Sequence, residues 1–383
     1  MTRKIVNIAL NGVTGRMGYR QHLVRSLLSI REQGGLVLAD GTAIYPEPIL
    51  VGRSEERLRA IAERHGLERW STNLDQVLGD PDLEVYFDTQ VTSAREPSLA
   101  QAIAAGKHVY TEKPVAASLD GALRLAAAAR EAGITNGVVQ DKLFLPGMIK
   151  LRRLVRAGFF GRILSARLEF GYWVFDGDLT PPQRPSWNYR KEDGGGIVLD
   201  MFPHWQYLLE DLLGPITAVY ARHATHVPRR WDESGTSYDV TADDAAYAVL
   251  EFESGALASV NSSWAVRVNR RELVELQVDG THGSAIAGLR NCAVQHRVST
   301  PMPVWNPDLP DPIDYPAQWT DVPDNQVFDN GFKTQWELFL RAVAEGTKFP
   351  WDLAEGAKGV QLAELALLSS AEGRRVPVPR LTS

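Results

Sequence analysis

The stretch KIVNIALNGVTGRMG, residues 4–18, decides the fold of this chain. Its first half is apolar and predicts a β-strand, and residues 17–33 predict a helix. A glycine-rich turn between a strand and a helix lets backbone N–H groups approach a pyrophosphate, and the helix N-terminus stabilises the negative charge. The stretch therefore predicts a dinucleotide site, and a tight turn that binds nothing is the alternative.

The spacing of the glycines departs from the usual fingerprint, which is G-x-G-x-x-G. Gly12, Gly15 and Gly18 are present, but Val13 stands where the first fingerprint glycine would be. Only two of the three glycine roles are clearly filled. The choice between the two interpretations therefore depends on the sequence downstream.

Length and composition restrict the class of protein. A chain of 383 residues is long enough for two domains that each bury a core. Its 44% hydrophobic and 23% charged residues are ordinary for a soluble globular protein. The formal net charge of −6 argues against a general nucleic-acid binder, because such proteins concentrate positive charge.

Cysteine usage and apolar runs indicate the compartment. Cys292 is the single cysteine, which excludes an internal disulfide framework and a Cys-rich zinc site, and we expect no metal. The apolar stretch at the N-terminus is too short for a signal sequence, and no run approaches the ~20 apolar residues of a membrane helix. We therefore expect a cytoplasmic protein that does not bind membranes.

Residues 1–145 alternate short apolar runs with helical segments, a pattern typical of a parallel sheet covered on both faces. Crossovers between such strands make a doubly wound sheet, and the glycine turn then follows its first strand, where these sheets bind nucleotides. This context favours the dinucleotide interpretation. The predicted strands are residues 4–10, 46–52, 83–89, 108–112 and 135–141, and the predicted helices are residues 17–33, 54–66, 96–106 and 118–133.

The predicted cofactor contacts begin in the turn and continue at the end of the second strand. An acidic residue there would bind the ribose 2′-OH of NAD, whereas an arginine accepts the 2′-phosphate of NADP. The sequence offers no carboxylate at this point, so NADP is favoured over NAD. Ser54 could instead only cap the next helix while Arg53 is solvated. The predicted contacts are Gly12, Val13, Thr14, Gly15, Arg16, Met17, Gly52, Arg53 and Ser54.

YTEKPVA, residues 110–116, follows a strand at the same edge of the sheet. The ammonium group of Lys113 can hydrogen-bond a substrate hydroxyl, and Pro114 fixes the local chain, with a cis bond as one way to do so. The chain resembles the Gfo/Idh/MocA oxidoreductase family over nearly its whole length. The segments that carry the resemblance are AGKHVYTEKP and LRRLVRAGFFGRILSARLEF. The resemblance implies a Rossmann-like first domain and a catalytic Lys113. It also adds Thr89, Gln90, Glu112 and Lys113 to the expected cofactor contacts.

The second signature of that family resembles GGGxxxDxGxH, and residues 194–204 read GGGIVLDMFPH. Asp200 and His204 are four residues apart, so a helix places them on one side. Oxidation of an alcohol needs a base with a pKa near neutrality, which histidine provides. We therefore expect Lys113, Asp200 and His204 to be catalytic. Asp200 would either orient the imidazole or bind the substrate hydroxyl.

Four positions depart from the family pattern. Pro203 replaces a glycine inside the predicted helix and could bend it and displace His204. Tyr207 stands where many relatives carry an aspartate, and Gln90 and Arg95 replace a common threonine and histidine. These differences leave the expected chemistry intact but leave the substrate class open.

Residues 146–383 predict a second α/β domain. Long alternating segments within residues 150–330 indicate a large, mostly antiparallel open sheet, and residues 332–346 and 352–373 read as helices. One face of such a sheet needs a cover. In the resembled family another subunit supplies it, which implies a homodimer or homotetramer through this sheet.

Aromatic residues near the second signature favour a carbohydrate or cyclitol. Sugar rings pack apolar C–H faces on aromatic planes and need polar partners for their hydroxyls. Any single one of these rings could equally belong to the core or to a subunit interface. The expected substrate contacts are Lys113, Trp173, Trp187, Tyr189, Asp200 and His204.

Two classes of function remain. The first is an NAD(P)-dependent enzyme that interconverts a ring hydroxyl and a ketone of a sugar, glycoside or cyclitol, or a redox-neutral variant that cleaves glycosidic bonds. The second is a catalytically silent, cofactor-sensing regulator on the same fold. Because a sensor has no need of Lys113, Asp200 and His204, the sequence favours the enzyme.

Overall fold

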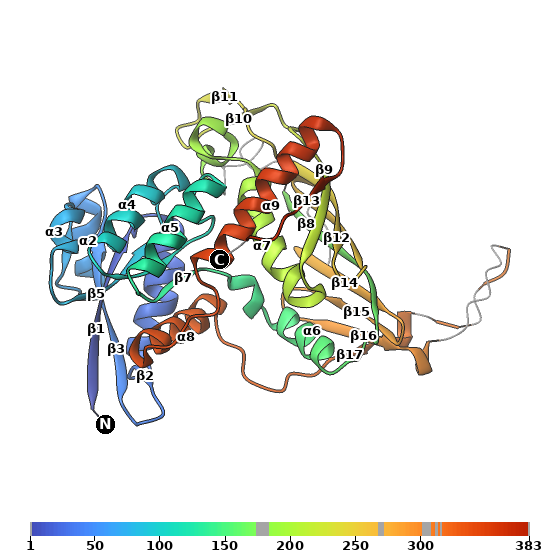
Figure 1. Cartoon of the computed structure of the whole chain (residues 1–383), viewed down its shortest axis with the longest axis horizontal. Coiled ribbons are helices and arrows are strands. Elements are labelled where there is room, and N and C mark those ends of the chain that lie inside the picture. Colours follow the sequence, from blue (N-terminus) through green and yellow to red (C-terminus); the bar gives the residue numbers. More distant parts are fainter. Residues whose placement is uncertain are drawn as a thin grey trace.

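Two large β-sheets stand side by side, and helices α7 (Ile197–Leu213) and α9 (Leu353–Glu372) lie between them (Figure 1). The computed structural model describes residues 2–173, 184–266, 272–300, 308–310, 313–314 and 316–381. This arrangement confirms a parallel first sheet and a mostly antiparallel second sheet. The strands are β1 (Arg3–Asn11), β2 (Leu36–Val37), β3 (Ala43–Val51), β4 (Trp70–Ser71), β5 (Leu83–Asp88), β6 (His108–Thr111), β7 (Asn136–Val138), β8 (Ile163–Trp173), β9 (Ile216–Ala224), β10 (Arg229–Trp231), β11 (Ser237–Asp239), β12 (Ala245–Phe252), β13 (Leu257–Val266), β14 (Val274–Gly280), β15 (Gly283–Ala287), β16 (Cys292–His296), β17 (Thr320–Asp321) and β18 (Val376–Pro377). A third sheet pairs β10 with β11.

The helices of the first part follow the predicted pattern. Ser54 and Ser118 accept a backbone hydrogen bond at the start of their helices, which confirms the capping that the sequence predicts. The remaining helices are η1 (Gly18–Leu28), α1 (Ser29–Glu32), α2 (Glu55–His65), α3 (Leu74–Leu78), α4 (Thr92–Ala104), α5 (Leu119–Glu131), η2 (Asp141–Phe144), α6 (Pro146–Arg156), η3 (Ser186–Tyr189), η4 (Lys191–Asp193), η5 (Arg297–Ser299), η6 (Pro316–Gln318) and α8 (Gly331–Glu345).

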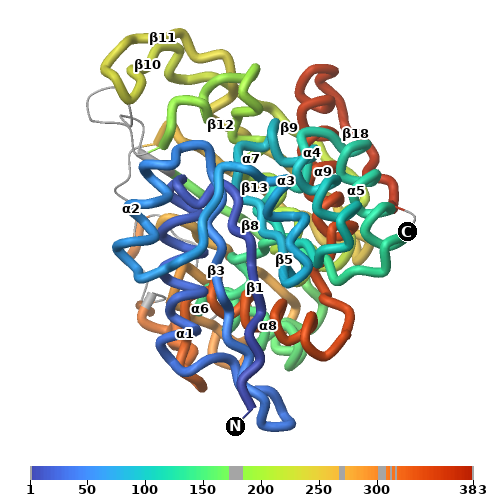
Figure 2. The backbone as a smooth tube through the Cα atoms, turned by 90° about the vertical axis from the view of Figure 1, so that its left-hand side faces the viewer, coloured from blue at the N-terminus to red at the C-terminus, as the bar shows by residue number. Residues whose placement is uncertain are grey.

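The first sheet has the order β4-β3-β1-β5-β6-β7, with β2 antiparallel on the edge of β3. This is the doubly wound order of dinucleotide-binding folds, with the crevice between β1 and β5. The five predicted strands are all present. β2 and β4 are short additions that the sequence analysis missed. In the view of Figure 2, β1 and β3 run side by side across the face toward the viewer.

The helix after the glycine turn starts at Gly18 and winds as a π-helix until Leu28, after which α1 continues it. Its position was predicted but its wider winding was not. A Cβ at Gly18 would lie 2.8 Å from the carbonyl oxygen of Gly12 and 2.7 Å from Cγ2 of Thr89. The helix therefore starts directly on the turn, with no room for a side chain between them.

The second sheet has the order β17-β16-β15-β14-β8-β13-β12-β9-β18. Its neighbouring strands are antiparallel except for β8 and β13, which are parallel. One face packs on α7 and α9 around buried Trp205 and Trp264. The other face exposes Tyr220, Tyr247 and Val249. The subunit that the sequence analysis expects on this face stays a prediction.

Helix α8 lies on the first sheet, although it follows the second sheet in the chain. Its Trp336 and Phe339 are fully buried in one core with Val6 and Ile8 of β1. Figures 1 and 2 both show the red α8 beside the blue strands. Helix α8 thus packs on the first sheet although its residues fall in the second predicted part, because helical periodicity shows an apolar face but not the sheet that covers it. The division into residues 1–145 and 146–383 stays a prediction.

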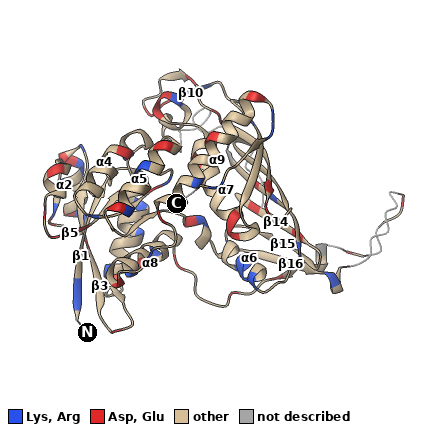
Figure 3. Cartoon of the chain, in the orientation of Figure 1, with Lys and Arg blue, Asp and Glu red and all other residues tan. Residues whose placement is uncertain are grey.

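Charges of both signs are spread over the ribbon (Figure 3). Two of the basic residues on α6 have ion-pair partners: Lys150 pairs with Asp324, and Arg152 pairs with Asp211.

Candidate active site

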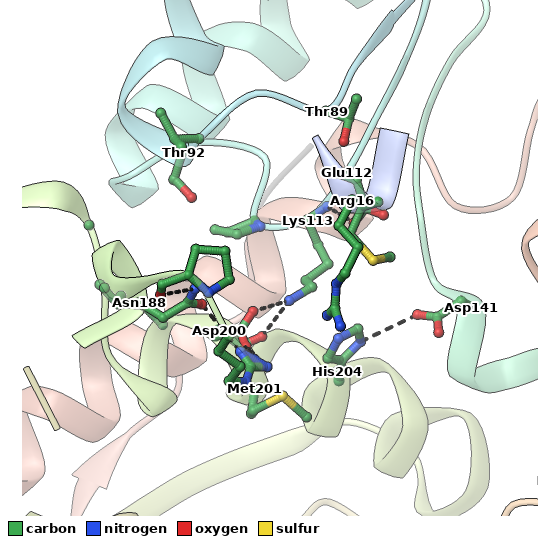
Figure 4. A pocket seen from close by; sticks show the side chains of 18 of the residues that line it. Arg16, Thr89, Thr92, Glu112, Lys113, Asp141, Asn188, Asp200, Met201 and His204 are labelled. Carbon is green, nitrogen blue, oxygen red and sulfur yellow. Dashed lines mark hydrogen bonds and ion pairs between the residues drawn. The ribbon is translucent and has the colours of Figure 1, made fainter. Parts of the chain in front are cut away.

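A cavity of about 440 Å³ lies between the carboxyl edge of the first sheet and α7 (Figure 4). It brings together side chains that are far apart in the sequence. The predicted site residues that line it are Gly15, Arg16, Met17, Thr89, Gln90, Glu112, Lys113, Trp187, Asp200 and His204. The other predicted residues with a described side chain do not line it: Gly12, Val13, Thr14, Gly52, Arg53, Ser54 and Tyr189.

The glycine turn (residues 12–18) has the backbone geometry that its sequence predicts. Gly12 adopts a φ of +85°, and a Cβ there would lie 2.9 Å from the backbone of Thr89. At Gly15 a Cβ would meet only the carbonyl oxygen of Gly12, at 3.3 Å, on the side that lines the cavity. The open cradle at Gly15 and the start of η1 together fit the phosphates of a dinucleotide.

The end of β3 lies outside the cavity. The Ser54 side chain accepts a hydrogen bond from the backbone N–H of Arg57, so it serves as a helix cap. Arg53 is exposed, and within the described parts of the chain it has no ion-pair partner. An exposed arginine at this position is accessible to the 2′-phosphate of NADP. The preference for NADP over NAD stays a prediction.

A buried network holds the loop that carries Lys113. The peptide bond between Lys113 and Pro114 is cis, as the sequence analysis considered. Arg95 donates to the carbonyl oxygens of Pro114 and Gln90 and pairs with the buried Asp88 at 3.2 Å. Arg95 thus links the ends of β5 and β6. In the sequence, Arg95 was notable only as a departure from the family pattern.

Glu112 belongs to a second buried network. His22 of η1 contacts its carboxylate at 2.8 Å, and the indole N–H of Trp336 donates to the other nitrogen of His22 at 3.0 Å. Burial would raise the pKa of Glu112, but the hydrogen bond and charge of His22, with Lys113 nearby, lower it. The backbone N–H of Lys113 also donates to Glu112. Helix α8 thereby supports the lysine loop, a contact that no local motif reveals.

Asp200, in the first turns of α7, holds two cations. Lys113 donates to its Oδ1 at 2.5 Å and to its backbone oxygen at 2.8 Å, and Arg184 donates to its Oδ2 at 2.8 Å. Burial would raise the pKa of this carboxyl, but Lys113 and Arg184 lower it to about 2. Asp200 is therefore ionised at neutral pH, and its side-chain hydrogen bonds to described residues go to Lys113 and Arg184 and not to His204.

His204 lies one turn later and is oriented by Tyr207 and Asp141. The Tyr207 hydroxyl is 2.6 Å from Nδ1 of His204, and Oδ1 of Asp141 is 3.7 Å from the same nitrogen. Burial, followed by the charges of Lys142, Lys113 and Arg184, lowers the pKa of His204 well below its usual value. The imidazole is therefore neutral at neutral pH. Tyr207, at the position where the family pattern has an aspartate, thus contacts His204.

Pro203 does not remove His204 from the site. Helix α7 is continuous through the proline, and His204 lines the cavity. The packing of α9 accommodates the ring, because a Cβ at Gly359 would lie 2.9 Å from Cα and Cβ of Pro203. The displacement that the sequence analysis considered is absent.

The three predicted aromatic contacts have different outcomes. Trp187 lines the cavity as expected. Tyr189 is only 1% exposed and packs on Trp264 with Arg230 over its ring, so the structure places it in the core and not with the residues that line the cavity. Trp173 ends β8, and its side chain lies outside the described residues.

The sequence analysis missed several residues that line the cavity. Asp141 and Lys142 follow β7, and Arg184 and Asn188 precede α7. Arg184 joins the others by donating to Asn188 at 3.2 Å as well as to Asp200. Their residue types carry no signal alone, although the end of a parallel strand is a position from which Asp141 could have been suspected.

Comparisons with known proteins agree with this architecture. Residues 7–139 match the model of an oxidoreductase family with an NAD-binding Rossmann fold, and residues 148–286 match the GFO/IDH/MocA C-terminal domain. The chain belongs to the Gfo/Idh/MocA oxidoreductase family. It is thus an oxidoreductase with an NAD-binding domain, and the resemblance found in the sequence is confirmed.

Relatives in this family include a D-xylose dehydrogenase of Paenarthrobacter nicotinovorans, 56% identical over 99% of this chain and 98% of its own. A 1,5-anhydro-D-fructose reductase of Ensifer adhaerens is 31% identical over 71% of this chain and 73% of its own. Among solved structures, a levoglucosan dehydrogenase in complex with NADH has a TM-score of 0.81 at 22% identity, over 99% of this chain and 100% of that one. That likeness shows the fold alone.

Among the described residues, none of the helices combines the length and apolarity that a membrane crossing requires.

Proposed function

We propose that this protein is an NAD(P)-dependent sugar dehydrogenase that oxidises a ring hydroxyl of an aldose such as D-xylose. The observation that carries the proposal is a neutral histidine in the same cavity as Lys113 and the glycine turn. A bound nicotinamide supplies the hydride acceptor. The residues that would hold the dinucleotide are Gly15, Arg16, Met17, Thr89 and Gln90.

His204 is the general base. A base must be unprotonated before the reaction, and the lowered pKa of His204 keeps the imidazole neutral at neutral pH. Tyr207 and Asp141 lie at Nδ1, and no hydrogen bond between described residues occupies Nε2. Nε2 can therefore take the proton of a substrate hydroxyl.

Lys113 binds the substrate oxygen rather than accepting its proton. Its Nζ donates to the Asp200 carboxylate at 2.5 Å, and an ammonium group has no lone pair with which to accept a proton. Two of its three N–H groups go to Asp200, and the third remains for a ligand. The carboxylate oxygens of Asp200 already accept hydrogen bonds from Lys113 and Arg184. Asp200 therefore either contacts the substrate through these oxygens or holds Lys113 in place.

A sugar is the substrate class that suits the cavity. Trp187 offers an aromatic plane for a ring face, and the polar side chains of Asn188 and Arg184 lie beside it. The D-xylose dehydrogenase that is 56% identical supports an aldose. Arg53 at the end of β3 favours NADP over NAD.

The test is a panel of aldoses, glycosides and inositols incubated with each cofactor, with reduced nicotinamide followed by absorbance and products identified by mass spectrometry. We expect a net increase in reduced nicotinamide when an aldose is the substrate. Product without an absorbance change would favour a redox-neutral enzyme that recycles its cofactor. Cofactor binding without any product would favour the regulator.

We further propose that the exposed face of the second sheet is covered by another copy of this chain, in a homodimer or homotetramer. Exposed Tyr220, Tyr247 and Val249 on this face support the proposal. Sedimentation analysis should give a mass of at least two chains.

A further inference from the structure

The hydroxyl of Tyr207 is the centre of a buried group of polar atoms. It is 2.6 Å from Nδ1 of His204 and 3.5 Å from Oδ1 of Asp141, and the backbone N–H of Lys142 donates to it at 3.2 Å. Tyr207 is 6% exposed and His204 is 5% exposed. Buried polar atoms need partners, so the single proton of this hydroxyl has a definite direction.

Two arrangements satisfy this group. In the first, Tyr207 donates to Nδ1, so the imidazole proton must be on Nε2, facing the cavity. In the second, Tyr207 donates to Asp141 and accepts from an Nδ1–H, so Nε2 keeps its lone pair. Only the second leaves a nitrogen that can take a proton from a substrate.

The charge of Asp141 selects the second arrangement. Its carboxylate lies within 3.7 Å of Nδ1 and 3.5 Å of the Tyr207 oxygen, and it can only accept hydrogen bonds. The electrostatic energy is lower when the phenol proton of Tyr207 and the Nδ1 proton of His204 both point toward this carboxylate. Lys142 occupies one lone pair of the Tyr207 oxygen, and the other is left for Nδ1–H.

We propose that Asp141, through Tyr207, fixes His204 as the tautomer with its proton on Nδ1 and its lone pair on Nε2. The inference rests on the proposed function, in which His204 is the base. Asp141 and Tyr207 act through His204, so they are positioning residues.

This tautomer balances the reaction. As the substrate O–H bond breaks, Nε2 gains the proton, the oxygen electrons form the carbonyl, and the C–H electron pair leaves with the hydride to the oxidised nicotinamide. The resulting imidazolium carries both ring protons, and Nδ1–H stays on Tyr207 with Asp141 beside it. Asp141 therefore also stabilises the positive charge that develops.

Other charged groups face the imidazole and bear on any pH measurement. The groups that lower its pKa are Lys142 beside Asp141, Lys113 after β6 and Arg184 before α7. Asp200 is engaged by two of these cations. The further charged residues that line the same cavity are Arg16, Arg95 and Glu112.

The test uses two near-isosteric variants and a direct readout of the tautomer. Asn at position 141 can donate to the Tyr207 oxygen and turn the phenol proton toward Nδ1, so Asp141→Asn should shift His204 to the Nε2–H form. Its turnover should fall about a hundredfold, at the lower end of the range for loss of a positioned proton-transfer group. Tyr207→Phe leaves the carboxylate near Nδ1, so we expect a loss of only about tenfold. Adding Tyr207→Phe to Asp141→Asn should recover part of the activity.

The tautomer is read by heteronuclear NMR of protein labelled at the histidine ring nitrogens, without cofactor, with the His204 signals assigned from a His204→Ala sample. We expect Nδ1–H in the wild type and Nε2–H in Asp141→Asn. Asp211→Asn, whose carboxylate pairs with Arg152, is the matched control and should change neither tautomer nor turnover.

The outcomes separate the two proposals. An Nε2–H wild type, an unchanged tautomer in Asp141→Asn, or strictly additive losses in the double variant would overturn the inference. The expected tautomers combined with full turnover in His204→Ala would support the positioning role and overturn the choice of base.

Discussion

The glycine turn and helix α7 face each other across the cavity, and they are built in different ways. The turn presents backbone: Gly15 leaves an open cradle, and neighbouring Gly12 packs on the backbone of Thr89. Helix α7 presents side chains, and each depends on a distant partner. Asp200 depends on Lys113, and His204 depends on Asp141.

The difference determines which substitutions impair each side of the cavity. On the backbone side, an added Cβ obstructs a ligand while charge changes elsewhere have little effect. On the α7 side, charge changes also matter, because burial and then the charges of Lys142, Lys113 and Arg184 lower the pKa of His204. Each prediction below changes one side and leaves the other intact.

The largest effect is expected on the α7 side. His204→Ala should lower turnover by roughly 10²–10⁴, the usual scale for a positioned proton-transfer group, and leave cofactor dissociation constants unchanged. Steady-state kinetics and calorimetric titration with each cofactor measure the two quantities. His282→Ala, on an exposed turn, is the control. Near-normal turnover would mean that another group is the base.

On the backbone side of the cavity, a substitution should change the affinity for the cofactor. Gly15→Val places a side chain in the cradle and should weaken both NAD and NADP by about a hundredfold, because it blocks the approach of the pyrophosphate. The thermal unfolding midpoint should fall less than in Gly18→Ala, since a Cβ at Gly15 makes one tight contact, at 3.3 Å, whereas a Cβ at Gly18 meets atoms at 2.7 and 2.8 Å. Unchanged affinity would refute a cofactor site at the turn.

Gly18→Ala is the matched control for that experiment. Its Cβ would lie 2.7 Å from Cγ2 of Thr89 and 2.8 Å from the Gly12 oxygen, so the packing must shift. We expect a loss of stability of ~1–3 kcal/mol, as in an overpacked core. A stable Gly18→Ala protein would show that the turn is less tightly packed than its contacts indicate.

A smaller effect should separate the two cofactors. Arg53→Ala should weaken NADP by about tenfold through loss of a charge-assisted contact with the 2′-phosphate, and should leave NAD within twofold. Parallel binding titrations measure the ratio. An equal loss for both cofactors would contradict the assignment.

The smallest effect should be a shift in pH dependence. His204 must be neutral to act, so activity falls as the pH falls through its pKa, which lies well below the usual value. Lys142→Gln removes one cation that lowers this pKa, so the acidic limb of kcat/KM should move up by roughly half a unit to one unit. Lys358→Gln, on the surface of α9, should leave the limb in place. A limb that stays at the same pH in Lys142→Gln would exclude His204 as the group that titrates.

The sequence predicted the parts of the fold that depend on near neighbours. The strand and helix periodicity of residues 1–145 and the caps at Ser54 and Ser118 were confirmed. β2 and β4 were missed because two residues are too few to show a period. The location of α8 was missed because its apolar face fits either sheet.

The site divides in the same way. Asp200 and His204 were found because a motif places them on one helix. Arg184, Asp141 and Lys142 were missed because their importance comes from distances that only the fold sets. Tyr189 was assigned to the substrate because residues 186–196 immediately precede the predicted catalytic helix, but its ring is buried in the core.

Helix α8 has a consequence for synthesis of the chain. A nascent chain displays β1 and η1 long before Trp336 and Phe339 leave the ribosome, so the apolar surface that α8 covers stays open for most of translation. His22 lacks its indole donor during the same interval. A chimaera that exchanges the nucleotide-binding part with that of a relative must therefore exchange residues 331–349 as well, or the new strands will receive a cover shaped for the old ones.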